Sequence, residues 1–401
     1  MRVVHVNYSD LGGGAGIAAF RFHKELIRQN IDSLYFVRQK KSQENSVIQP
    51  SEFVTLRNKA NIQLELFFKK MMKIEGSLPI AFLPDLNIGL INKLKPDIVH
   101  LHWIHGGFVS FKELSKIKVP IIWTLHDMWV IGNLNHYLPT DVGILYKKSK
   151  LEEYKNRWLD RIKNISFITP SLWLKNECMK NSILKNKSIY VIHNGLDLNN
   201  FYPIEKNNAK NHLRIDSSKL TLLLGAMGIE SSSRKGIDIV QNVLKKLYCS
   251  GSIDMEIIIF GSNKKEINND FYFPTHYLGR INRQQELTYI YSAADIFLLP
   301  SRADNLPNTG LEALACGTPI VAYNIGGIPE IIQHKYNGYL ATPFDLEDFE
   351  KGIYYVMGNN EQLIKNARST AEEKFDIVKN ARKYIDLYNR ILNKNIKVNA
   401  N

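Results

Sequence analysis

Two acidic residues, Asp304 and Glu312, stand in the segment of this sequence with the clearest chemical meaning. Asp304 lies in a loop that begins at Pro300. Glu312 follows after seven intervening residues, in what we expect to be the first turn of a helix. A loop carboxylate can hydrogen-bond sugar hydroxyls, a carboxylate on a helix can grip a ribose, and the N–H groups that start a helix attract phosphate. Taken alone, Glu312 also fits a favourable charge near a helix N-terminus, and Asp304 a turn residue.

A glycine-rich loop follows the first apolar run of the chain, in the segment Ser9-Asp10-Leu11-Gly12-Gly13-Gly14-Ala15-Gly16. Backbone N–H groups at Gly13 and Gly14, together with the start of the next helix, favour a diphosphate. The same glycines also suit a tight turn that binds nothing. The loop matches a loose dinucleotide fingerprint, but Arg38 stands where an NAD enzyme carries an acid, which leaves only an NADP-dependent oxidoreductase as an alternative.

Three histidines, His100, His102 and His105, raise the question of a metal site. His100 and His102 share one face of an expected strand, but no carboxylate or cysteine with ligand spacing accompanies them, so we expect no metal there. His102 and Trp103 are better candidates for contacts with an acceptor substrate. The sequence contains no Asp-x-Asp pair to bridge a divalent metal to a nucleotide diphosphate, and we expect neither a metal nor any other cofactor.

The charge balance predicts an anionic partner. The 401 residues carry a net charge of +13, but the basic residues are scattered and match no nucleic-acid-binding motif, so we expect no nucleic acid. A phosphorylated substrate or an anionic membrane surface fits the charge. The stretch 64–82 mixes large apolar residues with lysines, as a helix lying on a membrane does, although a core-facing helix with its lysines outward is the commoner arrangement.

The sequence predicts a protein of a reducing compartment. We expect no secretion signal, and no apolar run reaches the roughly 20 residues that span a bilayer. The three cysteines, Cys178, Cys249 and Cys316, are far apart and form no paired-cysteine motif. We therefore expect a cytoplasmic location, with peripheral attachment to the cytoplasmic face of the inner membrane as the alternative.

The elements that must position these residues follow from an alternation of short β-branched runs and longer helical patterns, which indicates βαβ units around a parallel sheet. The pattern starts twice and predicts an α/β fold of two doubly wound, Rossmann-like domains facing a central cleft. We expect an N-terminal domain over 1–198, a C-terminal domain over 199–375, and a helix within 376–401 that crosses back to the first domain. The expected strands are 3–8, 34–38, 97–101, 121–125, 167–169, 190–193, 220–226, 255–260, 277–278, 296–299 and 319–322.

The chain resembles the family 4 glycosyltransferases of the GT-B fold along nearly its whole length. The most specific part runs from Asp304 to Glu330, where two spaced acids precede an Ala-Cys-Gly-Thr-Pro turn, a strand and a Gly-Gly-Ile-Pro-Glu motif. Further ordered matches are the glycine loop, Thr124-Leu125-His126-Asp127, Ile192-His193-Asn194-Gly195-Leu196-Asp197, Arg234-Lys235-Gly236 and Tyr277-Leu278-Gly279-Arg280.

The resemblance implies a donor site in the C-terminal domain and an acceptor site in the N-terminal domain. Lys235, which we expect to open a helix, corresponds to the cation that meets the donor diphosphate, and Glu312 to the acid that binds the ribose. Asp304 corresponds to the first acid, which contacts the transferred sugar, and His126 to a histidine near that sugar and its phosphate. The resemblance places three further residues in the donor site: Arg234, Asn305 and Leu306.

The sequence departs from the family pattern at two positions. The first acid is usually Glu, so Asp304 is one methylene shorter. A second basic residue usually precedes the lysine by six positions, where this chain has Ile229. Arg234 can supply the missing charge, although neighbouring residues on a helix point in different directions.

The resemblance implies an enzyme that transfers a sugar from a nucleotide diphosphate to a glycan or a polyprenyl-linked glycolipid, with retention of configuration and without a metal. Assembly of a bacterial surface polysaccharide, such as O-antigen, capsule or exopolysaccharide, is the expected context. Two alternatives stay open beside it. One is the NADP-dependent oxidoreductase, and the other is a GT-B protein that binds or epimerises a nucleotide sugar without transferring it.

Overall fold

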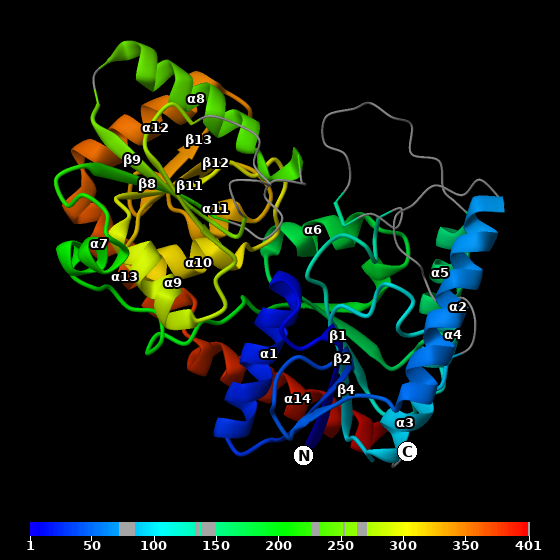
Figure 1. Ribbon diagram of the computed structural model, residues 1–401. Helices are drawn as coiled ribbons and strands as arrows, with labels where there is room; N and C mark the ends of the chain where they lie inside the picture. The colour runs from blue at the N-terminus through cyan, green and yellow to red at the C-terminus, as the bar shows by residue number, and fades with distance from the viewer. Residues whose placement is uncertain are drawn as a thin grey trace. The chain divides into compact units, whose positions relative to one another are not determined.

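The computed structural model describes residues 1–71, 85–132, 136–137, 150–225, 233–251, 253–262 and 271–399. The chain divides into two compact units. Unit 1 consists of Met1–Gly195 with Val378–Asn401, and unit 2 consists of Leu196–Ile377. Each unit is built around its own sheet, coloured blue to green in unit 1 and green to orange in unit 2 (Figure 1).

Unit 1 contains a seven-stranded sheet in the order β3-β2-β1-β4-β5-β6-β7. Each of its strand pairs is parallel. The order runs outward from β1 in both directions, as in a doubly wound fold. Most positions of the inner strands are buried because helices pack on both faces of the sheet, which is why these strands are continuous apolar runs. The strands are β1 (Arg2–Ser9), β2 (Asp32–Gln39), β3 (Val47–Ile48), β4 (Ile98–Leu101), β5 (Ile121–Thr124), β6 (Ile165–Thr169) and β7 (Ser188–Val191).

The helices of unit 1 cover this sheet and include the last helix of the chain. Helix α1 buries Ala18, Phe22 and Leu26, which recur at helical spacing along one face. Phe22 packs against Tyr384 of α14, so the first and last helices lie side by side (Figure 1). The helices are α1 (Gly13–Arg28), α2 (Glu52–Met71), α3 (Asn87–Lys93), α4 (Phe111–Leu114), α5 (Lys150–Arg161), α6 (Leu172–Lys180), the 3-10 turn η1 (Leu184–Asn186) and α14 (Ile377–Asn399).

Unit 2 contains a six-stranded sheet in the order β10-β9-β8-β11-β12-β13, with parallel pairs throughout. Its strands are β8 (Leu220–Gly225), β9 (Met255–Phe260), β10 (Thr275–Gly279), β11 (Ile296–Leu299), β12 (Ile320–Tyr323) and β13 (Gly338–Ala341). Its helices are α7 (Lys206–Leu213), the 3-10 turn η2 (Ser233–Lys235), α8 (Ile237–Ser250), α9 (Gln284–Ala293), α10 (Asn308–Ala315), α11 (Ile328–Ile331), α12 (Leu346–Gly358) and α13 (Asn360–Lys374).

Both sheets place chemistry-bearing residues just beyond the carboxyl ends of their strands. In unit 1, His102 follows β4 and His126 follows β5. In unit 2, Asp304 follows β11, and the 3-10 turn η2 leads from β8 towards α8. Carboxyl ends of neighbouring parallel strands share one edge, so residues distant in sequence meet there. No helix of the described residues is long and apolar enough to cross a membrane.

Candidate functional site

In unit 2, one buried carboxylate binds two adjacent cations. Oδ2 of Asp304 lies 2.7 Å from Nζ of Lys235 and 3.1 Å from a guanidinium nitrogen of Arg234. Asp304 is only 6% exposed. Burial alone would raise its pKa, but the charges of Lys235 and Arg234 outweigh burial and hold the pKa below its ordinary value. Asp304 is therefore ionised at neutral pH, and the three side chains together are positively charged.

The backbone around η2 explains how both cations reach the same oxygen atom. We predicted that Lys235 opens a helix, and this is wrong: it ends the short 3-10 turn, and α8 begins at Ile237. Gly236 separates the two elements in the left-handed region, with φ of 69°. Arg234 and Lys235 are neighbours in sequence, and both of their side chains contact Asp304. The backbone N–H of Arg302 donates to the carbonyl of Arg234 at 2.7 Å, which holds the turn beside the loop that carries Asp304.

The loop that carries Asp304 is fixed by close backbone contacts. A Cβ atom on Gly236 would lie 2.1 Å from the carbonyl oxygen of Pro300, and one on Gly326 would lie 2.2 Å from that of Asp304. The guanidinium of Arg234 also donates to the carbonyl of Ala303 at 2.6 Å. Glycine is therefore required at both contacts, and the acid and its cations are held in one rigid arrangement.

Glu312 lies in α10 and is 5% exposed. Because α10 begins at Asn308, Glu312 lies beyond the first turn, and our expectation of a first-turn acid was wrong. Its Oε2 accepts a hydrogen bond of 2.9 Å from the hydroxyl of Tyr291 in α9. Sequence reasoning missed Tyr291, which comes from a separate helix and carries no local motif. The hydroxyl fixes one oxygen of the carboxylate that we expect to bind ribose.

The two residues after Asp304 are both buried, with different roles. The backbone N–H of Asn305 donates to Oδ1 of Asp304 at 3.1 Å. The side chain of Leu306 packs in a hydrophobic core of unit 2. Ile229, where the family usually has a basic residue, lies outside the described residues, so the structure gives no contact for it.

In unit 1, the glycine loop is shaped by two of its glycines. Gly13 has φ of 67°, and a Cβ atom on Gly16 would lie 2.8 Å from the carbonyl oxygen of Ser9. Gly14 is exposed. The buried carboxylate of Asp10 accepts N–H bonds from Leu11, Lys41 and Ser42 and so ties this loop to the segment after β2. Burial opposes the ionisation of Asp10, but these hydrogen bonds lower its pKa overall.

The NADP alternative has little support at Arg38. Its guanidinium donates to the carbonyl of Gly106 at 3.0 Å and lies 5.1 Å from the centre of the Tyr8 ring. Arg38 is buried by these contacts within unit 1. A cation already used in packing is a poor partner for the 2′-phosphate of NADP.

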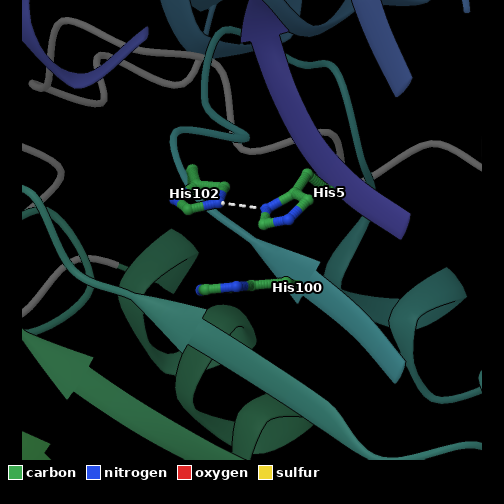
Figure 2. Close-up of side chains that lie close together, drawn as sticks. All are labelled: His5, His100 and His102. Carbon is green, nitrogen blue, oxygen red and sulfur yellow. Dashed lines mark hydrogen bonds between the residues drawn. The ribbon is translucent and has the colours of Figure 1, made fainter. Parts of the chain in front are cut away.

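Histidines on or just after the three central strands β1, β4 and β5 gather in unit 1. Nδ1 of His5 lies 2.9 Å from Nε2 of His102, and Nδ1 of His102 lies 3.2 Å from Nε2 of His126. His100 stacks on His102 with a centroid distance of 4.3 Å, and Figure 2 shows His5, His100 and His102 converging. Burial is the main cause that lowers the pKa of His126 to about 4 and that of His100 to about 3, and it places those of His5 and His102 well below 6.5.

The structure regroups the histidines that we considered for a metal. His5, rather than His105, joins His100 and His102 with ligand atoms within 4.8 Å. Nδ1 of His100 contacts the hydroxyl of Tyr388 at 2.6 Å and its Nε2 that of Thr124 at 2.8 Å. Both ring nitrogens of His100 are therefore engaged in hydrogen bonds.

His105 falls in a second group, with Asp127 and His136. Asp127, which has no ligand spacing to these histidines in the sequence, lies 3.5 Å from His105. Asp127 accepts hydrogen bonds from His136 at 2.6 Å and from the N–H of Trp129 at 2.9 Å. Each of its two oxygens therefore accepts a hydrogen bond.

The two acceptor candidates differ in exposure. His102 is buried, and both of its ring nitrogens contact other histidines. Trp103 is partly buried, and its ring packs edge-on against Tyr8 and lies parallel to the ring of His136. Trp103 thus keeps some of its surface available to a ligand, whereas the ring nitrogens of His102 contact only other histidines among the described residues.

Comparison with known proteins identifies the family. The family described as Glycosyltransferase Family 4 matches residues 12–200, and the one described as Glycosyl transferases group 1 matches residues 218–359. An uncharacterized glycosyltransferase of Haemophilus influenzae is 30% identical over 298 residues, which are 71% of this chain and 74% of that protein. The Escherichia coli UDP-Gal:alpha-D-GlcNAc-diphosphoundecaprenol alpha-1,3-galactosyltransferase is 26% identical over 321 residues, 75% of this chain and 76% of its own.

A solved structure shows the same fold. Anabaena HepE in complex with UDP-glucose covers 97% of this chain and 100% of its own, with a TM-score of 0.66 and 16% identity. The family matches and the relatives agree with the two parallel sheets and their helices. This chain belongs to the family 4 glycosyltransferases and has the GT-B fold.

Proposed function

We propose that this glycosyltransferase uses a nucleotide diphosphate sugar as its donor and retains the configuration of the anomeric carbon. The observation that carries the proposal is the pairing of Lys235 and Arg234 with one oxygen of Asp304. Two cations against one carboxylate leave a net positive charge where η2 meets the loop after β11. Fixed positive charge of this kind attracts a diphosphate and stabilises the charge that builds on it as the sugar departs.

The other donor contacts are proposed on the same basis. Glu312, oriented by Tyr291, binds the ribose hydroxyls, and Asp304 contacts hydroxyls of the transferred sugar. Asn305 and Leu306 contribute through the backbone, since Leu306 has its side chain in the core. Gly13 and Gly14 offer N–H groups to the phosphate at the start of α1.

The reaction that fits these groups is a same-face substitution. The bond between the anomeric carbon and the phosphate oxygen breaks, and its electron pair stays on the phosphate, where Lys235 and Arg234 stabilise it. The acceptor hydroxyl oxygen bonds to the anomeric carbon on the same face and passes its proton to the departing phosphate. Because the departing phosphate takes this proton, no carboxylate base is needed. His126 donates a hydrogen bond to the sugar or its phosphate.

We propose that transfer proceeds without a metal ion. Support comes from the sequence, which has no Asp-x-Asp pair, and from the two cations that can neutralise the leaving diphosphate. Activity that persists in a chelator would support this part of the proposal, and activity restored only by added Mg²⁺ or Mn²⁺ would overturn it.

We propose a lipid-linked or free glycan acceptor in bacterial surface polysaccharide assembly. The E. coli relative is named for a diphosphoundecaprenol acceptor, and that name supports the class. Helix α2 supports contact with an anionic membrane, because its exposed face carries both apolar and basic side chains. The exposed apolar side chains include Phe53, Leu56, Leu64, Leu66, Phe67 and Met71, and the exposed basic ones include Arg57, Lys59 and Lys70.

The membrane part of the proposal has its own test. The helix that we expected over 64–82 is described only to Met71, as the end of α2, and residues 72–84 lie outside the described residues. Sedimentation with phosphatidylglycerol vesicles should exceed that with phosphatidylcholine vesicles and should fall in Phe53→Ser/Phe67→Ser. Equal sedimentation with both lipids would count against an anionic membrane surface.

The donor site is tested most simply by ligand-dependent stability. A donor that binds only the folded chain must raise the melting temperature. We expect one class among UDP-, GDP- and ADP-sugars to do so with chelator present, and the shift to vanish in Lys235→Ala. Lys246→Ala, an exposed lysine of α8, is the matched control and should keep it. A folded protein that responds to no donor would contradict the site.

A further inference from the structure

Three imidazoles form one hydrogen-bonded row across the central strands of the unit 1 sheet. His5 belongs to β1, His102 follows β4 and His126 follows β5, and these strands are neighbours in the sheet. The two contacts join Nδ1 of each inner ring to Nε2 of the next ring outward, at 2.9 and 3.2 Å. Figure 2 shows the inner contact between His5 and His102.

Each of these three imidazole rings is neutral at neutral pH and carries one N–H proton. Burial disfavours the charged imidazolium, and neither His5 nor His102 is described in contact with a carboxylate that could offset it. A neutral imidazole has one N–H donor and one acceptor nitrogen. The two contacts therefore share one direction, with all three protons on Nδ1 or all three on Nε2.

The inner end of the row decides between these directions. Within the described part of the structure, Nε2 of His5 is buried and has no hydrogen-bond partner. With the protons on Nε2, His5 would bury an N–H that has no acceptor. With the protons on Nδ1, only a lone pair is left there, and buried unpaired donors are rarer in proteins than under-satisfied acceptors.

We propose that His5 and His102 are positioning residues that hold His126 as the tautomer protonated at Nδ1. His126 then meets a ligand oxygen as a neutral N–H donor through Nδ1, while Nε2 accepts from His102. The use of that N–H on the donor sugar or its phosphate rests on the proposed function. The tautomer itself is a property of the folded chain and exists without any ligand.

His100 does not take part, although it lies against His102. Its two ring nitrogens contact the hydroxyls of Tyr388 and Thr124, which can donate or accept as needed. His100 is therefore the matched control, because it is a buried histidine on a neighbouring strand that does not belong to the row of His5, His102 and His126.

The tautomers can be read from long-range ¹H–¹⁵N spectra of the full chain labelled with ¹⁵N-histidine, with His126 assigned by the loss of its signals in His126→Gln. We expect a protonated, pyrrole-like Nδ1 and a pyridine-like Nε2 for His126 in the ligand-free protein. A protonated Nε2, or signals averaged between both forms, would overturn the proposal. This measurement reads the tautomer in the wild-type protein, so it does not depend on whether the His5 variants fold.

Two variants of His5 distinguish an effect of its hydrogen bond to His102 from an effect of its packing. Asparagine can place an N–H donor near the position of Nδ1, so His5→Asn should keep the tautomer of His126, whereas His5→Phe should shift it towards Nε2–H or a mixture. His100→Gln should leave it unchanged. An unaltered His126 tautomer in a folded His5→Phe protein would show that the hydrogen bonds from His5 and His102 do not set this tautomer.

Activity then distinguishes the two proposals. We expect kcat to fall at least tenfold in His5→Phe and to recover in His5→Asn, with KM for the donor changed less. An Nδ1–H tautomer of His126 in a protein that neither binds nor transfers any nucleotide sugar would support the positioning role of His5 and His102 and contradict the proposed function. Sugar transfer by a protein whose His126 has the Nε2–H tautomer would support the proposed function and contradict the positioning role of His5 and His102.

Discussion

Nζ of Lys235 lies 2.7 Å from Oδ2 of Asp304, and the guanidinium of Arg234 approaches the same oxygen. The acid thus holds two cations in place before any ligand binds. Groups that are ordered in advance need not reorganise when charge develops on a leaving group. The pairing predicts that the losses of transfer activity on changing Asp304 and on changing Lys235 are not additive.

Asp304→Asn tests this coupling. The change leaves the two partly buried cations without their counter-charge, so they reorganise, and the sugar also loses its contact with the carboxylate. We expect kcat/KM for transfer to fall by about 10² to 10³, the range for loss of one preorganised electrostatic contact. The double variant with Lys235→Ala should lose little more than the worse single variant. Additive losses, measured by steady-state transfer, would show that the two residues act separately.

Gly236 predicts a stability difference from another glycine at the opposite end of α8. Gly236 and Gly251 have φ of 69° and 65°, but only at Gly236 does a Cβ atom clash, 2.1 Å from the carbonyl of Pro300. Gly251→Ala should cost about 1 kcal/mol from backbone strain alone. Gly236→Ala should cost about 3 kcal/mol or more, because the loop must also move. Equal urea midpoints for the two variants would contradict the close contact.

Tyr291→Phe should weaken nucleotide binding with little change in fold. The hydroxyl orients Glu312, and its loss leaves a buried carboxylate oxygen with one hydrogen bond fewer. We expect the Kd for a nucleoside diphosphate to rise about tenfold, which corresponds to about 1.4 kcal/mol. Calorimetry checks this, with Tyr289→Phe on the same helix as control. A nucleotide that binds Tyr291→Phe as tightly as wild type would exclude this role for Glu312.

His100 predicts an acid-sensitive fold. Burial lowers its pKa to about 3, whereas in the unfolded chain it is about 6.5. Between these values the unfolded state binds the extra proton, so the free energy of unfolding falls on acidification from about pH 6.5 towards pH 3. His100→Gln should reduce that slope by about 1.4 kcal/mol per pH unit. Urea titrations between pH 7 and pH 4 with the same slope for both proteins would contradict this.

The repeating βαβ pattern gave correct predictions for most strands because parallel strands buried on both faces are plain apolar runs. Two edge strands, Val47–Ile48 and Gly338–Ala341, were not predicted. The first has only two residues, and the second begins with glycine, so neither makes a β-branched run. Strand propensity in such short edges comes from their neighbours and not from the segment itself.

The candidate site could be predicted only where its residues lie in one segment. Asp304, Asn305 and Glu312 come from one continuous motif. Tyr291 and His5 reach their partners from other elements, and no local spacing announces them. The error at Lys235 arose because the left-handed Gly236 separates the 3-10 turn from α8, and the sequence does not show which conformation a glycine adopts.

The central claim is that this chain transfers a sugar from a nucleotide diphosphate with retention. The most direct measurement is product formation from UDP-, GDP- and ADP-sugars with a lipid diphosphate-linked glycan acceptor and chelator, with the anomeric proton of the new linkage read by NMR. We predict a product of the same anomeric configuration as the donor, formed by wild type and lost in Lys235→Ala. An inverted product, or full transfer by Lys235→Ala, would contradict the account.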